Sequence, residues 1–156
     1  MPAAKPFLDS NVLIYLYSAD EPGKRQVAVS LCLSPAVISS QVLNEVANVL
    51  TLKFDLPPDD VLGKIDEIAD RTELSIVGFS TIRKALQLKK AYRYSYFDSL
   101  MLASALENQC DILYSEDFQD GQTIERRLQI ANPFRPSLSE KVFSSRRVQS
   151  SEFRVQ

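Results

Sequence analysis

The stretch FLDSNVLI at positions 7–14 decides the first part of the fold. An apolar pair is followed by three polar residues and a second apolar run. We therefore expect a short buried strand that ends at Asp9 and leads directly into a helix. Further short apolar runs, each bounded by polar residues or proline, have the length and composition of buried parallel strands. They occupy residues 36–39, 74–77, 111–114 and 128–131.

Longer segments with helical patterns lie between these runs. Ser80 and Ser95 are suitable caps for the last two of them. Because strands alternate with helices, we predict a three-layer α/β/α domain over residues 1–134, with a short parallel sheet of four to five strands. Residues 135–156 are predicted to form a basic, serine-rich tail. Helices are expected at 10–17, 22–33, 40–54, 58–71, 80–93 and 95–108.

The composition excludes several kinds of catalytic site. The 156 residues carry a formal net charge of −2 and include no histidine, which removes histidine bases, Ser-His-Asp triads and histidine-bound zinc. Cys32 and Cys110 are too few for a disulfide framework and are expected to be reduced thiols, so we expect a cytoplasmic protein. The amino-terminal segment has the pattern of neither a secretory signal nor a membrane span. Catalysis would have to use carboxylates, hydroxyls, lysines or a bound metal.

Two aspartates directly follow predicted strands. Asp9 ends the first strand, and Asp117 follows the strand at 111–114. Each has a small polar residue two positions away, Asn11 and Ser115, that can hold the carboxylate by a hydrogen bond. A helix cap explains Asp9 equally well, and an acidic turn such as the one around Asp117 is ordinarily just solvated.

Two further acids lie on predicted helices. Asp98 begins the helix at 95–108, which is apolar on almost all sides. A carboxylate there is costly unless it is paired or bound to metal. The alternative for Asp98 is a capping box with Ser95. Glu45 lies at the border of the apolar face of the helix at 40–54, where a glutamate usually extends to the solvent.

The four acids are predicted to converge. In a parallel sheet, residues that follow a strand lie at its carboxyl edge, where the helices leading to the next strand also begin. Asp9, Glu45, Asp98 and Asp117 would therefore share one crevice. Converging carboxylates repel one another unless a cation lies between them, and oxygen ligands without His or Cys favour Mg²⁺ or Mn²⁺. Such sites commonly act on phosphate esters.

In order, spacing and context, these motifs resemble the acidic motifs of PIN-domain ribonucleases, and most of all those of the bacterial VapC toxins. The resemblance covers residues 7–134. It rests on FLDSNVLI at 7–14, the helix that bears Glu45, YFDSLMLASAL at 96–106 and ILYSEDF at 112–118.

The resemblance implies a function and a set of partners. The expected chemistry is endonucleolytic cleavage of RNA by metal-activated water, which leaves a 5′-phosphate. Members of the family usually form homodimers and are blocked by a small antitoxin. The implied ligands of one or two Mg²⁺ or Mn²⁺ ions are Asp9, Glu45, Asp98 and Asp117, supported by Asn11 and Ser115. Glu116 and Asp120 compete with Asp117 for the fourth acidic role.

A basic segment precedes Asp98. Residues 80–97 contain five basic and no acidic side chains. The basic residues are expected to contact RNA phosphates, and Tyr92 or Tyr94 to stack on an unpaired base. For each residue, a solvated helix face with core aromatics is an equally good explanation. The basic residues are Arg83, Lys84, Lys89, Lys90 and Arg93.

Two other functions fit part of the pattern. A haloacid-dehalogenase-type phosphatase also has an aspartate after its first strand, but it requires a second aspartate two positions later, where this chain has Asn11. The other alternative is a PIN-like domain without activity that binds RNA or protein. None of the four motif acids is missing, which favours the nuclease.

Overall fold

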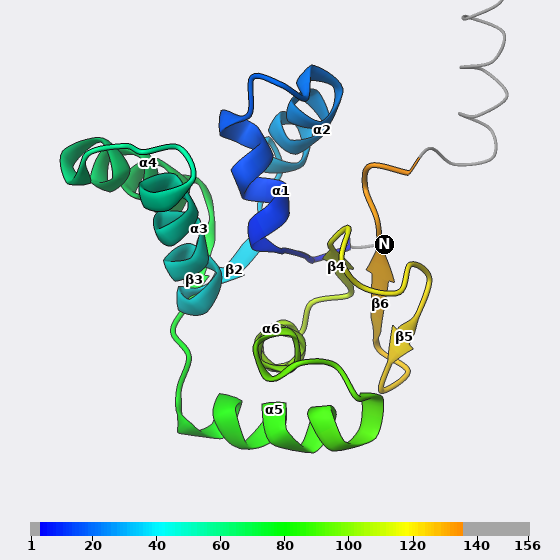
Figure 1. The fold of residues 1–156 in the computed structure, drawn as a ribbon. Coiled ribbons are helices and arrows are strands. Elements are labelled where there is room, and N and C mark those ends of the chain that lie inside the picture. The colour runs from blue at the N-terminus through cyan, green and yellow to red at the C-terminus, as the bar shows by residue number, and fades with distance from the viewer. Residues whose placement is uncertain (1–3, 136–156) are drawn as a thin grey trace, which may run out of the picture.

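The computed structural model describes residues 4–135. Apart from Arg135, the tail expected at 135–156 lies outside the described residues. One sheet forms the middle layer, and helices cover both of its faces (Figure 1). The predicted three-layer α/β/α architecture is confirmed.

The sheet contains six short strands in the order β3-β2-β1-β4-β6-β5. All neighbouring strands pair in parallel except β5 and β6, which are antiparallel. The strands are β1 (Pro6–Leu8), β2 (Val37–Ser39), β3 (Glu73–Ser75), β4 (Ile112–Tyr114), β5 (Thr123–Ile124) and β6 (Leu128–Ala131).

The sheet differs from its prediction in two details. β5 is an additional strand of two residues, too short to produce an alternating pattern in the sequence. The strand predicted at 74–77 is shifted to Glu73–Ser75 and is not buried, since Leu74 is 37% exposed. β3 forms one edge of the sheet, where an apolar side chain can remain exposed. The apolar composition of this segment therefore did not reveal its exposure.

The helices divide between the two faces of the sheet. α1 to α4 lie on one face, and α5 and α6 lie on the other (Figure 1). The segment predicted as one helix at 10–17 is a short α-helix followed by a 3₁₀ turn. The helical elements are α1 (Ser10–Ile14), η1 (Tyr15–Tyr17), α2 (Pro22–Cys32), α3 (Ser40–Leu52), α4 (Pro58–Arg71), α5 (Phe79–Tyr92) and α6 (Tyr96–Glu107).

Capping residues mark where the last two helices, α5 and α6, begin. The Ser95 hydroxyl accepts a hydrogen bond from the Asp98 amide at 3.1 Å, which confirms Ser95 as the cap of α6. Ser80 is not the cap of α5. That helix begins one residue earlier, with Gly78 at its N-cap, and the Thr81 hydroxyl accepts from the Gly78 amide at 3.1 Å. Cap chemistry thus predicted the helix but placed its cap two residues too late.

α6 is the central helix of its face. Every residue from Ser99 to Leu106 is buried, as expected for a helix that is apolar on all sides. It packs between the sheet and α5, and its first turn is the less buried end of the helix. That first turn carries Asp98.

The strand order reverses between β1 and β4. From β1 the chain moves outward to β2 and β3, whereas β4 and β6 lie on the other side of β1. In such sheets the loops that leave the two central strands diverge, and a crevice opens beyond their carboxyl ends. Asp9 follows β1 at this place, and its amide donates to the Tyr114 carbonyl at the end of β4 (3.1 Å).

No helix within residues 4–135 has the length and apolar character needed to cross a membrane.

Candidate functional site

Asp9 is the most enclosed of the four predicted acids. Only 3% of its surface is exposed. It occupies the N-cap position of α1, yet its carboxylate makes no capping hydrogen bond, so a cap does not explain this side chain. Instead the carboxylate accepts from the Ser10 hydroxyl (3.1 Å), the Asn11 amide (3.0 Å) and the Ser115 hydroxyl (2.6 Å). These donors hold a charged group that burial would otherwise make costly.

Ser10 connects Asp9 to Glu45. The Ser10 hydroxyl lies 3.1 Å from Asp9 Oδ1 and 2.8 Å from Glu45 Oε2. Because a hydroxyl has one proton, the two carboxylates share a single donor. Glu45 is half-buried in α3, and Gln41, one turn earlier, donates to its other oxygen at 3.3 Å. The side chain at the border of the apolar face therefore turns inward, toward the end of β1.

Asn11 connects Asp9 to Asp117. Its side-chain nitrogen lies 3.0 Å from Asp9 Oδ2, 3.0 Å from Asp117 Oδ2 and 3.3 Å from Ser115 Oγ. The Ser115 hydroxyl also accepts from the Asp117 amide at 3.1 Å. The other end of the Asn11 amide, Oδ1, is buried and accepts no hydrogen bond from residues 4–135. The amide is thus oriented by the two carboxylates, at the cost of one unsatisfied acceptor.

Asp98 lies beside this network. It is half-buried in the first turn of α6, and its carboxylate accepts no hydrogen bond from the backbone amide of Ser95. The return bond of a capping box is therefore not formed. Burial raises the pKa of Asp98, the charge of Asp117 raises it further, and the hydrogen bond with Ser95 opposes both effects.

The pKa of Asp9 is raised well above the ordinary value of an aspartate. Burial raises its pKa to about 6, the negative charge of Glu45 adds to the rise, and hydrogen bonds from Ser115 and Ser10 oppose it. Desolvation penalises the charged form of a carboxylate, which explains the direction. A buried carboxylate with a raised pKa at a crevice is a frequent mark of a functional site.

The two acids that compete with Asp117 are engaged elsewhere. Glu116 accepts from the Tyr15 hydroxyl (2.6 Å) and pairs with Lys24 (3.1 Å). Asp120 accepts from the backbone amide of Asn132 (2.8 Å) and lies 3.9 Å from the Arg135 guanidinium. Among the three, Asp117 is the one whose carboxylate is linked to Asp9 through Asn11.

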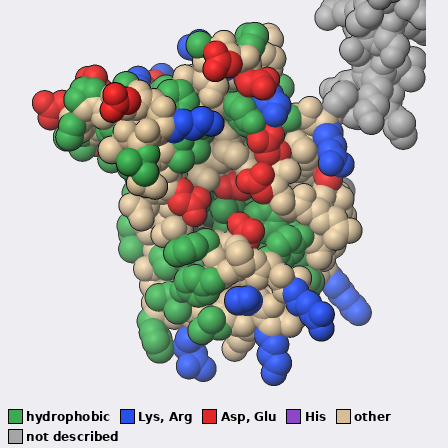
Figure 2. All heavy atoms as spheres, viewed as in Figure 1, with side chains coloured by type: hydrophobic (Ala, Val, Ile, Leu, Met, Phe, Trp, Pro, Cys, Tyr) green, Lys and Arg blue, Asp and Glu red, His purple; other side chains and the backbone are tan. Residues whose placement is uncertain are grey.

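Acidic side chains gather in the middle of the face drawn in Figure 2, where α1 begins, between α3 and α6. Asp9, Glu45 and Asp117 are linked there through Ser10 and Asn11 rather than by direct contact. Within residues 4–135, no three acidic side chains approach closely enough to hold one ion as they stand. Like charges repel, and the hydrogen-bond donors lie between them. The assignment of these acids as metal ligands stays a prediction.

The basic side chains of α5 lie apart from the acids. Figure 2 shows Lys and Arg side chains along the lower edge of the molecule, with exposed apolar side chains between them and the acidic region. Lys84 pairs with Glu125 at 2.5 Å, whereas Arg83, Lys89, Lys90 and Arg93 are exposed. All five remain predicted RNA contacts.

The two tyrosines that were expected to stack on RNA are partly occupied by the fold. The Tyr92 hydroxyl accepts from the Glu125 amide at 2.9 Å, and the Tyr94 hydroxyl is hydrogen-bonded to Gln122. The Tyr94 ring packs against Phe118 at 4.8 Å between centroids. Both rings are half-buried, so they anchor the loop after β4 and the β5–β6 hairpin to the end of α5.

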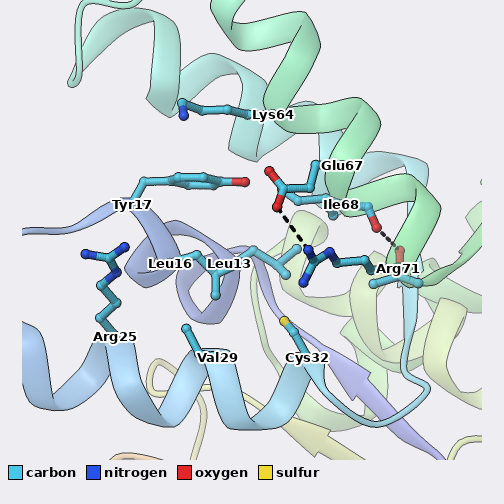
Figure 3. A pocket seen from close by; sticks show the side chains of 11 residues that line it. Leu13, Leu16, Tyr17, Arg25, Val29, Cys32, Lys64, Glu67, Ile68 and Arg71 are labelled. Atoms are coloured by element: carbon cyan, nitrogen blue, oxygen red, sulfur yellow. Dashed lines mark hydrogen bonds and ion pairs between the residues drawn. The ribbon is translucent and has the colours of Figure 1, made fainter.

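A separate groove lies between α1, η1, α2 and α4 (Figure 3). Its volume is about 340 Å³. Apolar side chains form its floor, and the charged residues Arg25, Lys64, Glu67 and Arg71 surround them. The Lys64 ammonium lies 4.7 Å from the centre of the Tyr17 ring. The apolar members are Leu13, Leu16, Val29 and Ile68, together with Cys32.

Two parts of the site were missed from the sequence. Ser10 was noted only as a polar residue after Asp9, although its position inside the FLDSNVLI stretch was a usable signal. The contact of Lys24 with Glu116 joins residues 92 positions apart, and neither residue has a local pattern that predicts it.

A family model described as the PIN domain matches residues 7–119, which is more than half of the chain. The chain belongs to the PIN-domain family. This finding confirms the resemblance seen in the acidic motifs. No curated protein sequence matches the chain at a significant level.

Solved structures share the PIN fold of this chain. The toxin VapC20 of Mycobacterium tuberculosis, described as cleaving the sarcin–ricin loop, superposes with a TM-score of 0.59 at 16% identity, over 72% of this chain and 92% of that one. A toxin–antitoxin complex from Klebsiella pneumoniae gives 0.62 at 19% identity, over 83% and 98%. VapBC2 of Rickettsia felis, bound to a promoter DNA fragment, gives 0.59 at 16% identity, over 81% and 98%. At these identities the likeness concerns the fold.

Proposed function

We propose that this PIN-domain protein is a metal-dependent endoribonuclease that acts in the cytoplasm as the toxin of a toxin–antitoxin pair. The observation that carries the proposal is the hydrogen-bonded set of Asp9, Glu45 and Asp117 at the point where the strand order reverses. Asp98 lies in the first turn of α6 and completes the predicted four acids. The likeness to VapC toxins supports this function.

The donor set fits a hard divalent cation. All candidate ligands are carboxylate oxygens, and the chain has no histidine. Mg²⁺ and Mn²⁺ prefer such oxygen ligands. Asp9, Glu45, Asp98 and Asp117 would hold one or two of these ions, which supply an activated water and offset the charge that develops on the phosphate. The raised pKa of Asp9 also fits, because a nearby cation would lower it again.

The protein's own groups then have separable tasks. Asp9 and Glu45 are held at a defined spacing by Ser10, and Asp9 and Asp117 by Asn11. Ser115 orients both Asp9 and the loop that carries Asp117. The exposed basic residues of α5 would attract the RNA backbone and lead it toward the acids. Lys84 has the weakest support for this role because Glu125 already pairs with it.

Removal of the metal is the direct test of the nuclease activity. Purified protein with Mg²⁺ or Mn²⁺ is expected to cleave total RNA, and EDTA is expected to stop the cleavage. Mapping the ends of the products is expected to show 5′-phosphates. Cleavage that persists in EDTA would exclude the metal mechanism. Binding of RNA without any cleavage would instead support the alternative, a PIN-like module that has no activity.

The groove between α1, η1, α2 and α4 is the proposed binding site of the antitoxin. Its apolar floor and its three basic residues suit an amphipathic segment with acidic side chains. A small protein encoded directly upstream of this chain's gene would be the expected partner. The similar structure from Klebsiella pneumoniae is a toxin–antitoxin complex.

A charge placed in the groove is expected to block this partner. Val29→Asp puts a carboxylate among the apolar side chains of the groove and should weaken binding of the neighbouring gene's product about 100-fold. Calorimetry with the two purified proteins measures the change. Leu52→Asp, on an exposed side chain at the end of α3, is the matched control and should bind normally. Equal binding by both variants would place the partner elsewhere.

The expected homodimer also stays a proposal. Several large apolar side chains on and beside α5 are exposed, which is unusual for a surface that faces only water. They are Ile76, Phe79, Ile82, Leu86 and, in α6, Phe97. The mass of the protein in solution decides whether a second copy covers them.

A further inference from the structure

A cluster of polar and aromatic side chains lies next to the acidic site and has no task in the chemistry proposed above. Glu116 is its centre. Its carboxylate accepts from the Tyr15 hydroxyl at 2.6 Å and from the Lys24 ammonium at 3.1 Å. Lys24 also donates to the Tyr15 hydroxyl at 3.1 Å, so the three polar groups form a closed triangle.

Aromatic contacts support this triangle. The Lys24 ammonium lies 4.8 Å from the centre of the Tyr15 ring and 5.6 Å from that of Phe134. The two rings meet edge to face, with centroids 4.9 Å apart. Four segments of the chain therefore join here: η1, α2, the loop after β4 and the segment after β6.

The triangle holds the residue immediately before Asp117. Asp117 lies in an irregular loop, is exposed, and has the Asn11 amide as its carboxylate's hydrogen-bond donor within the described residues. Its backbone is fixed on one side by Ser115, whose hydroxyl accepts from the Asp117 amide. Glu116 provides the second fixed point, so that both residues directly before Asp117 are held.

We propose that Lys24 and Tyr15 are positioning residues: they clamp Glu116, keep it out of the acidic site, and thereby set the place of Asp117. This inference rests on the proposed metal-dependent function. It assigns opposite tasks to two adjacent acids. Asp117 faces the site, and Glu116 is the anchor of its loop.

Two features distinguish the clamp from an ordinary surface ion pair. Exposed pairs usually contribute little because both side chains are mobile and solvated. Here the Lys24 and Glu116 side chains are only 34% and 23% exposed, and a third polar group with two rings restrains the lysine. If Lys24 is removed, Glu116 becomes a partly buried carboxylate without a cation, next to a site that attracts cations.

The test compares Mn²⁺ affinity among variants of the full chain. Lys24→Met keeps the length of the side chain and removes its charge. It is expected to weaken Mn²⁺ binding about tenfold in calorimetry, the lower end of what outer-shell changes cost. Lys24→Arg keeps a cation above the rings and should bind as the wild type does. RNA cleavage should fall in Lys24→Met at limiting Mn²⁺ and recover at saturating Mn²⁺.

A double variant separates positioning from general damage. Glu116→Gln keeps an oxygen that accepts from Tyr15 but needs no cation. Combined with Lys24→Met, it should restore most of the lost Mn²⁺ affinity. Lys5→Met is the matched control, because Lys5 also pairs with a glutamate, Glu73 (3.6 Å), but precedes β1 at the opposite end of that strand from Asp9. It should leave Mn²⁺ affinity unchanged.

The outcomes are distinguishable. Lys24→Met with the Mn²⁺ affinity of wild type overturns the inference while the proposed function stands. A double variant as weak as Lys24→Met also overturns it, since the defect would then not pass through the charge of Glu116. If Lys24→Met fails to fold by circular dichroism, Tyr15→Phe, which loses one hydroxyl and keeps its ring contact, must show the weaker Mn²⁺ binding. A wild-type chain that binds no Mn²⁺ overturns the proposed function and this inference with it.

Discussion

Replacing Asp9 by asparagine is expected to reduce metal-dependent RNA cleavage about 1000-fold or more, because a bound metal contributes several kcal/mol to such reactions and each 1.4 kcal/mol is about tenfold. Asp9 is the acid with the most contacts, linked through Ser10 to Glu45 and through Asn11 to Asp117. Asparagine has nearly the same shape but lacks the negative charge. Initial rates on a defined RNA, at several Mg²⁺ concentrations, measure the loss.

The control for this variant uses the same chemical change at the other end of a strand. Asp111 precedes β4, is exposed, and accepts a hydrogen bond from the Lys5 amide at 2.8 Å. Asp111→Asn lies away from the carboxyl edge and should cleave RNA as the wild type does. Circular dichroism should show that both variants are folded. An Asp9→Asn variant that retains full activity would remove Asp9 from the proposed mechanism.

The stability of the protein is expected to fall as the pH rises from about 4 to about 7. In the folded chain the pKa of Asp9 is raised from 3.8 to about 6, mainly by burial. Between these values the folded state binds more protons than the unfolded state, so the free energy of unfolding decreases with rising pH. At roughly 1.4 kcal/mol per pH unit, Asp9 accounts for a loss of at most about 3 kcal/mol, complete above the folded pKa.

The contribution of Asp9 can be isolated from that of other titrating groups. Urea unfolding of wild type and Asp9→Asn in EDTA, at intervals between pH 4 and pH 7, gives the difference in unfolding free energy. The unfolding free energy of Asp9→Asn should increase steadily relative to that of the wild type as the pH rises, because asparagine does not ionise. Two curves that run parallel over this range would show that Asp9 has an ordinary pKa.

Local sequence patterns predicted most of the architecture. The helix at α6 was recognisable because it is apolar on all sides, and its Ser95 cap is where the sequence placed it. β3 and β5 show the limits. An edge strand such as β3 has apolar residues that are exposed, and β5 has too few residues to form a pattern. Strand exposure depends on position in the sheet, which a run of residues does not encode.

The arrangement inside the acidic region was less predictable. Ser10 joins its neighbour Asp9 to Glu45, which lies 35 positions after Ser10 in the sequence. The choice among Glu116, Asp117 and Asp120 was open because three acids in one turn have similar local patterns. The three acids differ in their tertiary contacts. Glu116 contacts Tyr15 and Lys24, Asp120 contacts Asn132, and Asp117 contacts Asn11.

The sequence by itself determined most of the strands and helices along the chain, the absence of histidine chemistry, and the four acids predicted to form the site. Such features depend on residues close together in the chain, where periodicity, caps and composition act. Only the tertiary structure decided that Asp9 is enclosed, with its pKa raised to about 6, and that Glu116 pairs with Lys24. Desolvation and pairing arise from groups up to 106 positions apart in the sequence, brought together by the packing of the sheet and its helices.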